Sequence, residues 1–105
     1  MNVNDYQNYV LRGASEKYKD PRFAMIALMG ELGEVADVIK KGSIYTQSKE
    51  DYASKLKEEV GDYLWQTFAL LNSLNLSFEE VVNSNVEKLN KRHGGATIDL
   101  TGGER

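Results

Sequence analysis

The chain has 105 residues, of which 13 are Lys or Arg and 16 are Asp or Glu, giving a net charge of -3, and it contains no cysteine. Its basic residues are dispersed, which argues against a nucleic-acid partner, and no secretory signal pattern or apolar run near the roughly 20 residues of a membrane span is present. We therefore expect one cytoplasmic domain without a membrane segment, large enough for a core but small enough to gain from self-association.

A first helix is predicted over residues 4–18, with Asn4 as its cap. The single proline then marks the start of a second helix, because the order Asp20-Pro21 is typical of an N-cap followed by a first helical residue. We expect the second helix to end at Gly42 after residues 21–41, with an apolar stripe formed by Leu28, Leu32, Val35 and Ile39.

Two more helices follow a loop predicted at residues 43–47. Ser48 and Asp51 are spaced as in a capping box and open the longest predicted helix, whose apolar stripe comprises Leu56, Val60, Leu64, Leu71 and Leu74. Ser77 and Glu80 open a fourth helix that ends at His93, before the glycine pair 94–95, with inward positions Phe78, Val82, Val86 and Leu89. No convincing alternating strand pattern is present, so the expected class is all-α with four helices.

Two acidic pairs are the most informative motifs of the chain. In Glu31-x-x-Glu34 and in Glu59-x-x-Asp62, residues three apart share one helical face. Both cross pairs have the same midpoint, between residues 46 and 47, so a hairpin folded there would set Glu31 opposite Asp62 and Glu34 opposite Glu59. Four converging carboxylates repel one another, and such hard oxygen ligands suit Mg²⁺ or Mn²⁺. The pattern predicts a divalent-metal site formed by these four residues.

Each pair alone is also compatible with an ordinary solvated helix face, but both pairs interrupt faces that are otherwise partly apolar. Three glycines lie inside the helices beside the acids, and each costs about 1 kcal/mol relative to alanine. They leave room for a ligand or another backbone, or they permit tight helix packing; they are Gly30, Gly33 and Gly61.

A stripe on the fourth helix presents an amide and two cations, Asn85, Lys88 and Arg92. It is a candidate phosphate-binding surface, and a solvated basic edge at the helix C-terminus is the alternative. Trp65 is a candidate for stacking on a base, although an aromatic at helical spacing is more often a core residue.

Taken in order, residues 30–34 (GELGE), residues 58–65 (EEVGDYLW) and residues 85–89 (NVEKL) with Arg92 resemble the MazG-like all-α nucleoside triphosphate pyrophosphohydrolases. The resemblance covers most of the chain. It implies a four-helix MazG-like bundle over residues 1–95, with its core completed by a homodimer or homotetramer, and an irregular tail over residues 96–105.

The resemblance also implies a Mg²⁺-dependent reaction in which water attacks the α-phosphorus of a nucleoside triphosphate and releases pyrophosphate, with a role in nucleotide-pool housecleaning. Glu31, Glu34, Glu59 and Asp62 would hold Mg²⁺, with Mn²⁺ as an alternative ion, and Glu34 or Glu31 would activate the water. The substrate contacts would come from Asn85, Lys88, Arg92 and Trp65.

Three other functions can be compared with this reaction. A di-iron carboxylate bundle needs Glu-x-x-His elements with two histidines, whereas this chain has a single histidine. Within the family, the substrate is alternatively phosphoribosyl-ATP. A non-enzymatic metal-binding interaction module is the third alternative, and pyrophosphate release would distinguish it from an enzyme.

Overall fold

The computed structural model describes residues 1–44 and 48–93 and, in these residues, contains helices and no strand. The elements in chain order are the helix α1 (Val3–Gly13), the short 3-10 helix η1 (Glu16–Lys19), and the helices α2 (Pro21–Ile44), α3 (Lys49–Ser73) and α4 (Phe78–Arg92). The all-α class and the four expected helices are therefore confirmed. The predicted tail at residues 96–105 lies outside the described residues.

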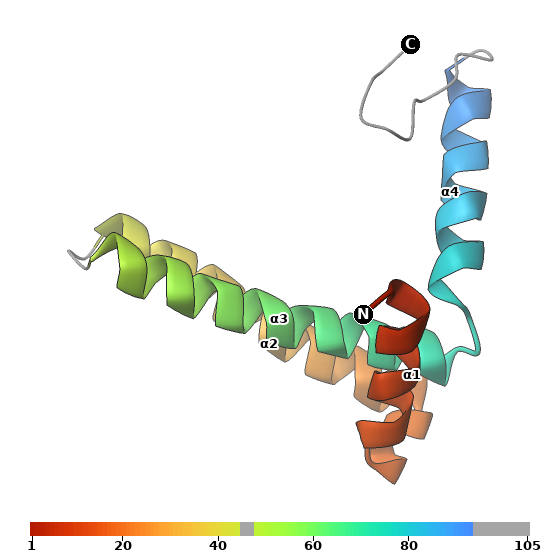
Figure 1. Ribbon diagram of the computed structural model, residues 1–105, viewed down its shortest axis with the longest axis horizontal. Helices are drawn as coiled ribbons and strands as arrows, with labels where there is room; N and C mark the ends of the chain where they lie inside the picture. Colours follow the sequence, from red (N-terminus) through yellow and green to blue (C-terminus); the bar gives the residue numbers. More distant parts are fainter. Residues whose placement is uncertain (45–47, 94–105) are drawn as a thin grey trace.

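The helices α2 and α3 form a long antiparallel hairpin that dominates the molecule (Figure 1). At one end of the hairpin, α1 packs across α3, and η1 packs against both α2 and α3. The last helix, α4, departs from this same end and points away from the hairpin (Figure 1). The chain is thus a two-helix arm with a small packed base and a projecting helix.

The predicted first helix was too long and began too late. Its cap is Asn2, whose Oδ1 accepts a hydrogen bond from the Asp5 N–H at 2.8 Å. The helix ends at Gly13, and the backbone of Ala14 is extended. A separate 3-10 turn then carries the chain toward Asp20. The reason is local, because Gly13 has a low helix propensity and the extended backbone of Ala14 interrupts the series of helical hydrogen bonds.

The start of α2 was predicted correctly, since Asp20 Oδ1 accepts from the Arg22 N–H at 2.9 Å. Its end was not, because Gly42 lies inside the helix rather than after it. A Cβ atom at position 42 would overlap the Tyr52 ring. This glycine therefore lets α2 and α3 approach closely near the far end of the arm, and residues 45–47 of the predicted loop lie outside the described residues.

The caps of the last two helices agree with the sequence. Ser48 Oγ accepts from the Asp51 N–H at 3.1 Å at the start of α3, which is the longest helix at 25 residues. At the start of α4, Ser77 and Glu80 form both hydrogen bonds of a capping box. Local capping chemistry thus fixes where both helices begin.

The side-chain amide of Gln7, in α1, connects the elements at the base through hydrogen bonds. Its Nε2 donates to Asn72 Oδ1 at 3.0 Å and to the Leu76 carbonyl at 2.9 Å. Its Oε1 accepts from the Phe78 N–H at 3.0 Å, where α4 begins. One amide therefore joins α1, the end of α3 and the start of α4.

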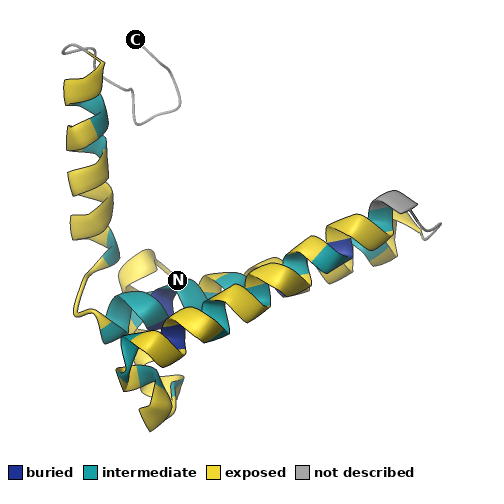
Figure 2. Ribbon diagram, turned by 180° about the vertical axis from the view of Figure 1, so that it is seen from behind, coloured by how far each residue is buried: buried dark blue, intermediate teal, exposed yellow. Residues whose placement is uncertain are grey.

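The core is small. The buried cluster at the base consists of Val10, Phe68 and Ala69, with half-buried aromatics around it, and further buried apolar residues are Ala24 and Val38 (Figure 2). The predicted α2 stripe is split, because Leu32 and Ile39 are exposed while Leu28 and Val35 are half-buried. A helix with apolar residues on two sides cannot turn both toward one neighbour.

The inward face predicted for the fourth helix is only partly covered. Phe78 is half-buried and its ring stacks on that of Phe68, and Val86 and Leu89 are half-buried, whereas Val82 is exposed. The physical reason is the position of α4, which contacts the described chain mainly through α1 and extends away from α2 and α3 (Figure 1). After Phe78, the apolar positions of α4 therefore have no extensive partner surface among the described residues.

Candidate metal centre

Three carboxylates meet between α2 and α3. Glu31 comes from α2 and Glu59 and Asp62 come from α3, and one oxygen of each lies within 4.8 Å of the others. Glu59 is buried, Glu31 is half-buried and Asp62 is exposed. The group therefore runs from the helix contact out to the surface, where a ligand can approach.

The helical spacing and the hairpin explain this geometry. Glu59 and Asp62 are neighbours on one face of α3, and the antiparallel course of α2 brings Glu31 beside them. The predicted juxtaposition of Glu31 and Asp62 is thus present. Glu34, the fourth predicted ligand, is exposed and is not part of this group among the described residues.

The carboxylates of the group repel one another, and this repulsion is visible in the pKa of Glu31. Burial raises the pKa of Glu31, and the charges of Asp62, Glu59 and Glu34 raise it further. Lys55 supplies partial compensation, with its Nζ 3.5 Å from Glu59 Oε1 one turn earlier on α3. A cation among the three carboxylates would relieve the remaining repulsion. Three carboxylate oxygens from two helices are also the donor set that a hard divalent cation accepts, so these residues fit Mg²⁺.

Two polar side chains near the acids were not identified as site residues from the sequence. The phenol of Tyr6, on α1, has a raised pKa because it is partly buried and because Tyr9 and Asp62 lie nearby. Gln66 lies one turn after Asp62 on α3, and its Oε1 is buried without a hydrogen-bond partner in the described chain. Gln66 could have been identified from the sequence, because it lies on the same stripe of α3 as Glu59 and Asp62. No sequence feature indicated that α1 would bring Tyr6 close to Asp62.

Trp65 belongs to an aromatic cluster at the base. Its ring meets that of Tyr18 edge to face at 5.3 Å between centroids, and Tyr18 meets Phe23 in the same way at 5.0 Å. Trp65 is half-buried and packs against the core of Val10 and Phe68. The ring therefore has a structural role in the single chain.

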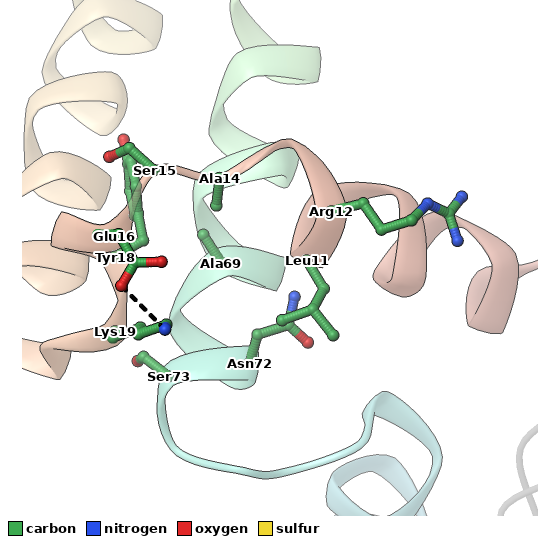
Figure 3. A pocket seen from close by; sticks show the side chains of 10 residues that line it. All are labelled: Leu11, Arg12, Ala14, Ser15, Glu16, Tyr18, Lys19, Ala69, Asn72 and Ser73. Atoms are coloured by element: carbon green, nitrogen blue, oxygen red, sulfur yellow. Dashed lines mark ion pairs between the residues drawn. The ribbon is translucent and has the colours of Figure 1, made fainter.

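The predicted phosphate-binding residues lie elsewhere. Asn85, Lys88 and Arg92 are exposed on α4, which points away from the arm that carries the acids (Figure 1). A single chain thus does not bring the cations to the carboxylates. The pocket in Figure 3, of about 260 Å³, is also separate, because it is lined by α1, η1 and the end of α3 and includes none of Glu31, Glu59 and Asp62.

The glycines beside the acids are not explained by packing within the chain. A Cβ atom built at Gly30, Gly33 or Gly61 would meet nothing within 4 Å. Tight contact between α2 and α3 is therefore not their reason. These positions leave room for a ligand or another backbone to approach.

The fold and the acidic group define an all-α protein with a carboxylate cluster between two antiparallel helices. Comparison with known proteins places it more closely, since the MazG nucleotide pyrophosphohydrolase domain matches residues 19–96. This match covers most of the chain. The chain therefore belongs to the MazG nucleotide pyrophosphohydrolase family.

Individual proteins also resemble the chain. The chain is 28% identical to the Gene 37 protein of Mycobacterium phage L5 over 98% of its own length and 92% of that protein. It is 37% identical to the uncharacterized protein YpjD of Bacillus subtilis (strain 168) over 73% of its length and 70% of that protein. The crystal structure of iMazG from Vibrio DAT 722 has a similar fold, with a TM-score of 0.67, 24% identity and coverage of 89% of this chain and 97% of that one.

The expectation of a chain without a membrane segment can be compared with the length and apolar character of the helices. Within the described part of the chain, no helix is both long enough and apolar enough to cross a bilayer.

Proposed function

We propose that the chain is a Mg²⁺-dependent nucleoside triphosphate pyrophosphohydrolase, which cleaves its substrate to a nucleoside monophosphate and pyrophosphate in nucleotide-pool housecleaning. The observation that carries the proposal is the convergence of Glu31, Glu59 and Asp62 between α2 and α3. Membership of the MazG family supports the reaction class. The substrate, the ion and the roles of individual residues are parts of the proposal.

In the proposed site, Glu31, Glu59 and Asp62 hold Mg²⁺, with Mn²⁺ as the alternative. The bound ion would neutralise negative charge that develops on the phosphate oxygens. Glu34 is exposed one helical turn after Glu31 and is the fourth proposed ligand. Either Glu34 or Glu31 accepts the proton of the attacking water, because a carboxylate with a free oxygen at the rim of the group can reach it.

The remaining substrate contacts are assigned by charge and chemistry. Lys88 and Arg92 neutralise the leaving pyrophosphate, and Asn85 donates to a phosphate oxygen. Trp65 lies one turn after Asp62, and the half-buried ring is the proposed platform for the base. Gln66 adds an acceptor in the same region, because its buried Oε1 has no partner within the described residues. The active protein is proposed to be a homodimer or a homotetramer.

The test is pyrophosphate release from a panel of ribonucleoside and deoxyribonucleoside triphosphates and phosphoribosyl-ATP, with Mg²⁺ and with a chelator. We expect release from at least one nucleoside triphosphate that depends on Mg²⁺. Asp62→Asn and Glu34→Gln should each lower it by about 100-fold or more, since even outer-sphere changes at metal sites cost roughly 10–100-fold.

The matched control is Asp37→Asn. Asp37 is a carboxylate of the same helix α2, but it pairs with Lys41 at 3.0 Å and lies outside the acidic group. This variant should keep wild-type turnover. Release only from phosphoribosyl-ATP would reassign the substrate, and no release from any compound would indicate a binding module instead of an enzyme.

A further inference from the structure

Lys55 lies on the same face of α3 as two members of the acidic group, which consists of Glu31, Glu59 and Asp62. Lys55, Glu59 and Asp62 follow one another at intervals of four and three residues, which is the spacing of neighbours on a helix surface. The Nζ atom of Lys55 lies 3.5 Å from Glu59 Oε1. The arm therefore brings a cation of its own to the edge of the acidic group.

The acid in this ion pair is far less exposed than the acids in two other pairs of the same spacing. The Glu59 side chain is 11% exposed, against 47% for Asp37 in α2 and 72% for Glu87 in α4. Exposed ion pairs contribute little, because water already solvates both charges. A carboxylate that is nearly buried has lost most of this solvation and depends on a counter-charge. Lys55 therefore meets a requirement that the exposed pairs do not have.

The order of the two residues points to the same conclusion. An acid four residues before a lysine stabilises a helix better than the reverse order does. The two exposed pairs have the favourable order, and they are Asp37 with Lys41 and Glu87 with Lys91. Lys55 comes before Glu59, which is the less favourable order. Support of the helix is therefore a weak reason for a lysine at this position, and the charge of the acidic group is a stronger one.

The charges of the acidic group indicate when this lysine is needed. Three ionised carboxylates carry three negative charges, and Lys55 offsets one of them. Repulsion remains, since burial and the neighbouring acids raise the pKa of Glu31. A bound divalent cation would offset two charges and compete for the oxygens of Glu59. The attraction between Glu59 and the Lys55 ammonium would then fall.

The ammonium can change its partner without a movement of α3. The Lys55 side chain is 55% exposed, and a lysine carries its charge on a flexible four-carbon stem. A phosphate group bound beside the acids would offer it a strong, negatively charged acceptor. The cations already assigned to the substrate, Lys88 and Arg92, lie on α4, which points away from the arm (Figure 1). Lys55 thus provides a positive charge where the single chain has placed the carboxylates.

We propose that Lys55 is the counter-ion of the acidic group in the ion-free protein, and that its ammonium moves from Glu59 to a phosphate oxygen of the substrate when a divalent cation binds. The counter-ion role rests on the geometry of the ion pair. The move to a phosphate oxygen rests on the proposed function. Lys55 then lowers the affinity of the acidic group for a free ion and raises its affinity for the nucleotide.

The loss of Lys55 should therefore have effects of opposite sign. A free divalent cation should bind more tightly, because it no longer competes with the ammonium or is repelled by it. The nucleotide should bind more weakly, because a charge-assisted contact to a phosphate oxygen is lost. A lysine that only held Glu59 in place would, when removed, weaken the binding of both.

The test compares Lys55→Met with the wild type in two titrations. Binding of Mn²⁺ to the nucleotide-free protein is followed by electron paramagnetic resonance, and the variant should bind this ion about tenfold more tightly. The KM for the preferred nucleoside triphosphate at saturating Mg²⁺ should rise about tenfold, with a smaller change in kcat. Unchanged or weaker Mn²⁺ binding would overturn the counter-ion role, and an unchanged KM would overturn the move to the substrate.

Two further variants separate position from charge. Lys55→Arg keeps the positive charge and should have close to the wild-type affinity for Mn²⁺. Lys57→Met removes the same charge from an exposed position of α3 two residues further on, away from the stripe of the acids, and should leave both titrations unchanged. If Lys57→Met tightened Mn²⁺ binding as much as Lys55→Met, the effect would reflect net charge alone and the proposal would fail.

Thermal unfolding gives a readout that does not need turnover. In a chelator, Lys55→Met should have a lower midpoint than the wild type, because Glu59 loses its counter-charge. Saturating Mg²⁺ should remove this difference, since the ion takes the place of the ammonium. A difference that persists undiminished in Mg²⁺ would contradict the exchange.

The same measurements distinguish failure of this proposal from failure of the proposed function. If the wild type binds Mn²⁺ but cleaves no nucleotide, the proposed function fails, and the ion titration and the midpoints still decide the counter-ion role. If the wild type binds no Mn²⁺, the acidic group is not a metal site and the exchange is wrong.

Discussion

At the scale of single residues, Glu31 is where the negative charge of the acidic group has its clearest effect. Its pKa is raised above the usual 4.5 by burial and by Asp62, Glu59 and Glu34. A raised carboxyl pKa means that the folded chain holds this proton more tightly than the unfolded chain does. As the pH rises above about 4.5, the unfolded chain loses the proton first, and the free energy of unfolding decreases. The decrease is complete once the pH has passed the folded-state pKa, and the loss of stability persists at higher pH.

Glu31→Gln should therefore stabilise the metal-free protein at about pH 7.5, with the gain vanishing near pH 4, where the carboxyl is neutral in both states. The measurement is the thermal unfolding midpoint in a chelator at the two pH values. Added Mg²⁺ should raise the wild-type midpoint more than that of the variant. The control is Glu58→Gln, an exposed neighbour outside the acidic group. Equal midpoints for Glu31→Gln and wild type near pH 7.5 would show that the repulsion is unimportant.

Gln66 presents the opposite case, because its Oε1 is buried and has no hydrogen-bond partner among the described residues. Leaving such an oxygen unsatisfied costs roughly 1–3 kcal/mol. Gln66→Met keeps a similar length and removes the oxygen, and it should raise the free energy of unfolding in urea by about 1 kcal/mol while lowering turnover. Gln66→Glu is the contrasting variant, because it adds charge beside the acids and should be destabilising. A destabilised Gln66→Met protein would mean that the oxygen has a partner after all.

Much of the acidic group could be predicted from the residues alone. The spacing of Glu59 and Asp62 on one helix, and the common midpoint of the two pairs, depend only on helical periodicity and a hairpin. Gln66 and Tyr6 could not be identified in this way. Whether an amide oxygen is buried without a partner, or a phenol from a distant helix lies near Asp62, depends on tertiary packing that spacing does not specify.

Among the elements, the hairpin of α2 and α3 depends on a glycine at its far end. Gly42→Ala gains about 1 kcal/mol in helix propensity, but the new methyl group would overlap the Tyr52 ring. We expect a net loss of about 1–3 kcal/mol, typical of overpacking. Chemical denaturation measures it.

Two further variants test whether the Tyr52 ring causes this loss of stability. Gly13→Ala has nothing within 4 Å of the added carbon and should be neutral or slightly stabilising. Tyr52→Ala combined with Gly42→Ala should recover stability relative to Tyr52→Ala alone, because the obstructing ring is gone. If Gly42→Ala is stabilising in the wild-type background, the close approach of the two helices is not maintained in solution.

The starts of α2, α3 and α4 were easier to predict than the end of α2 and the partners of the helices. The caps Asp20, Ser48 and Ser77 act within three residues of themselves, so local sequence sufficed. The end of α2 depends on its contact with Tyr52, which local sequence does not show. Similarly, a 3.6-residue period identifies the apolar residues of α4 but not whether the surface that covers them belongs to the same chain.

At the scale of the molecule, stability should depend on concentration. If the active protein is the proposed homodimer, each tenfold rise in chain concentration changes the free energy of association by about 1.4 kcal/mol. The thermal midpoint should rise accordingly, by a few degrees, in a dilution series followed by circular dichroism. A Met25→Lys, Ile39→Lys double variant, which places two charges at exposed apolar positions of α2, should unfold at a lower and concentration-independent midpoint. A constant midpoint for the wild type would argue for a chain that is stable alone.

The order in which the chain assembles follows from the hairpin. The extensive contact between α2 and α3 joins neighbouring segments, whereas the Gln7 to Asn72 hydrogen bond closes a loop of 65 residues. Short loops close faster and at lower entropic cost than long ones. We therefore expect the arm to form first, with its carboxylates already facing one another, and α1 to dock later. Association of two arms in the proposed oligomer would be a bimolecular step, so refolding at high dilution should slow while the early gain of helix does not.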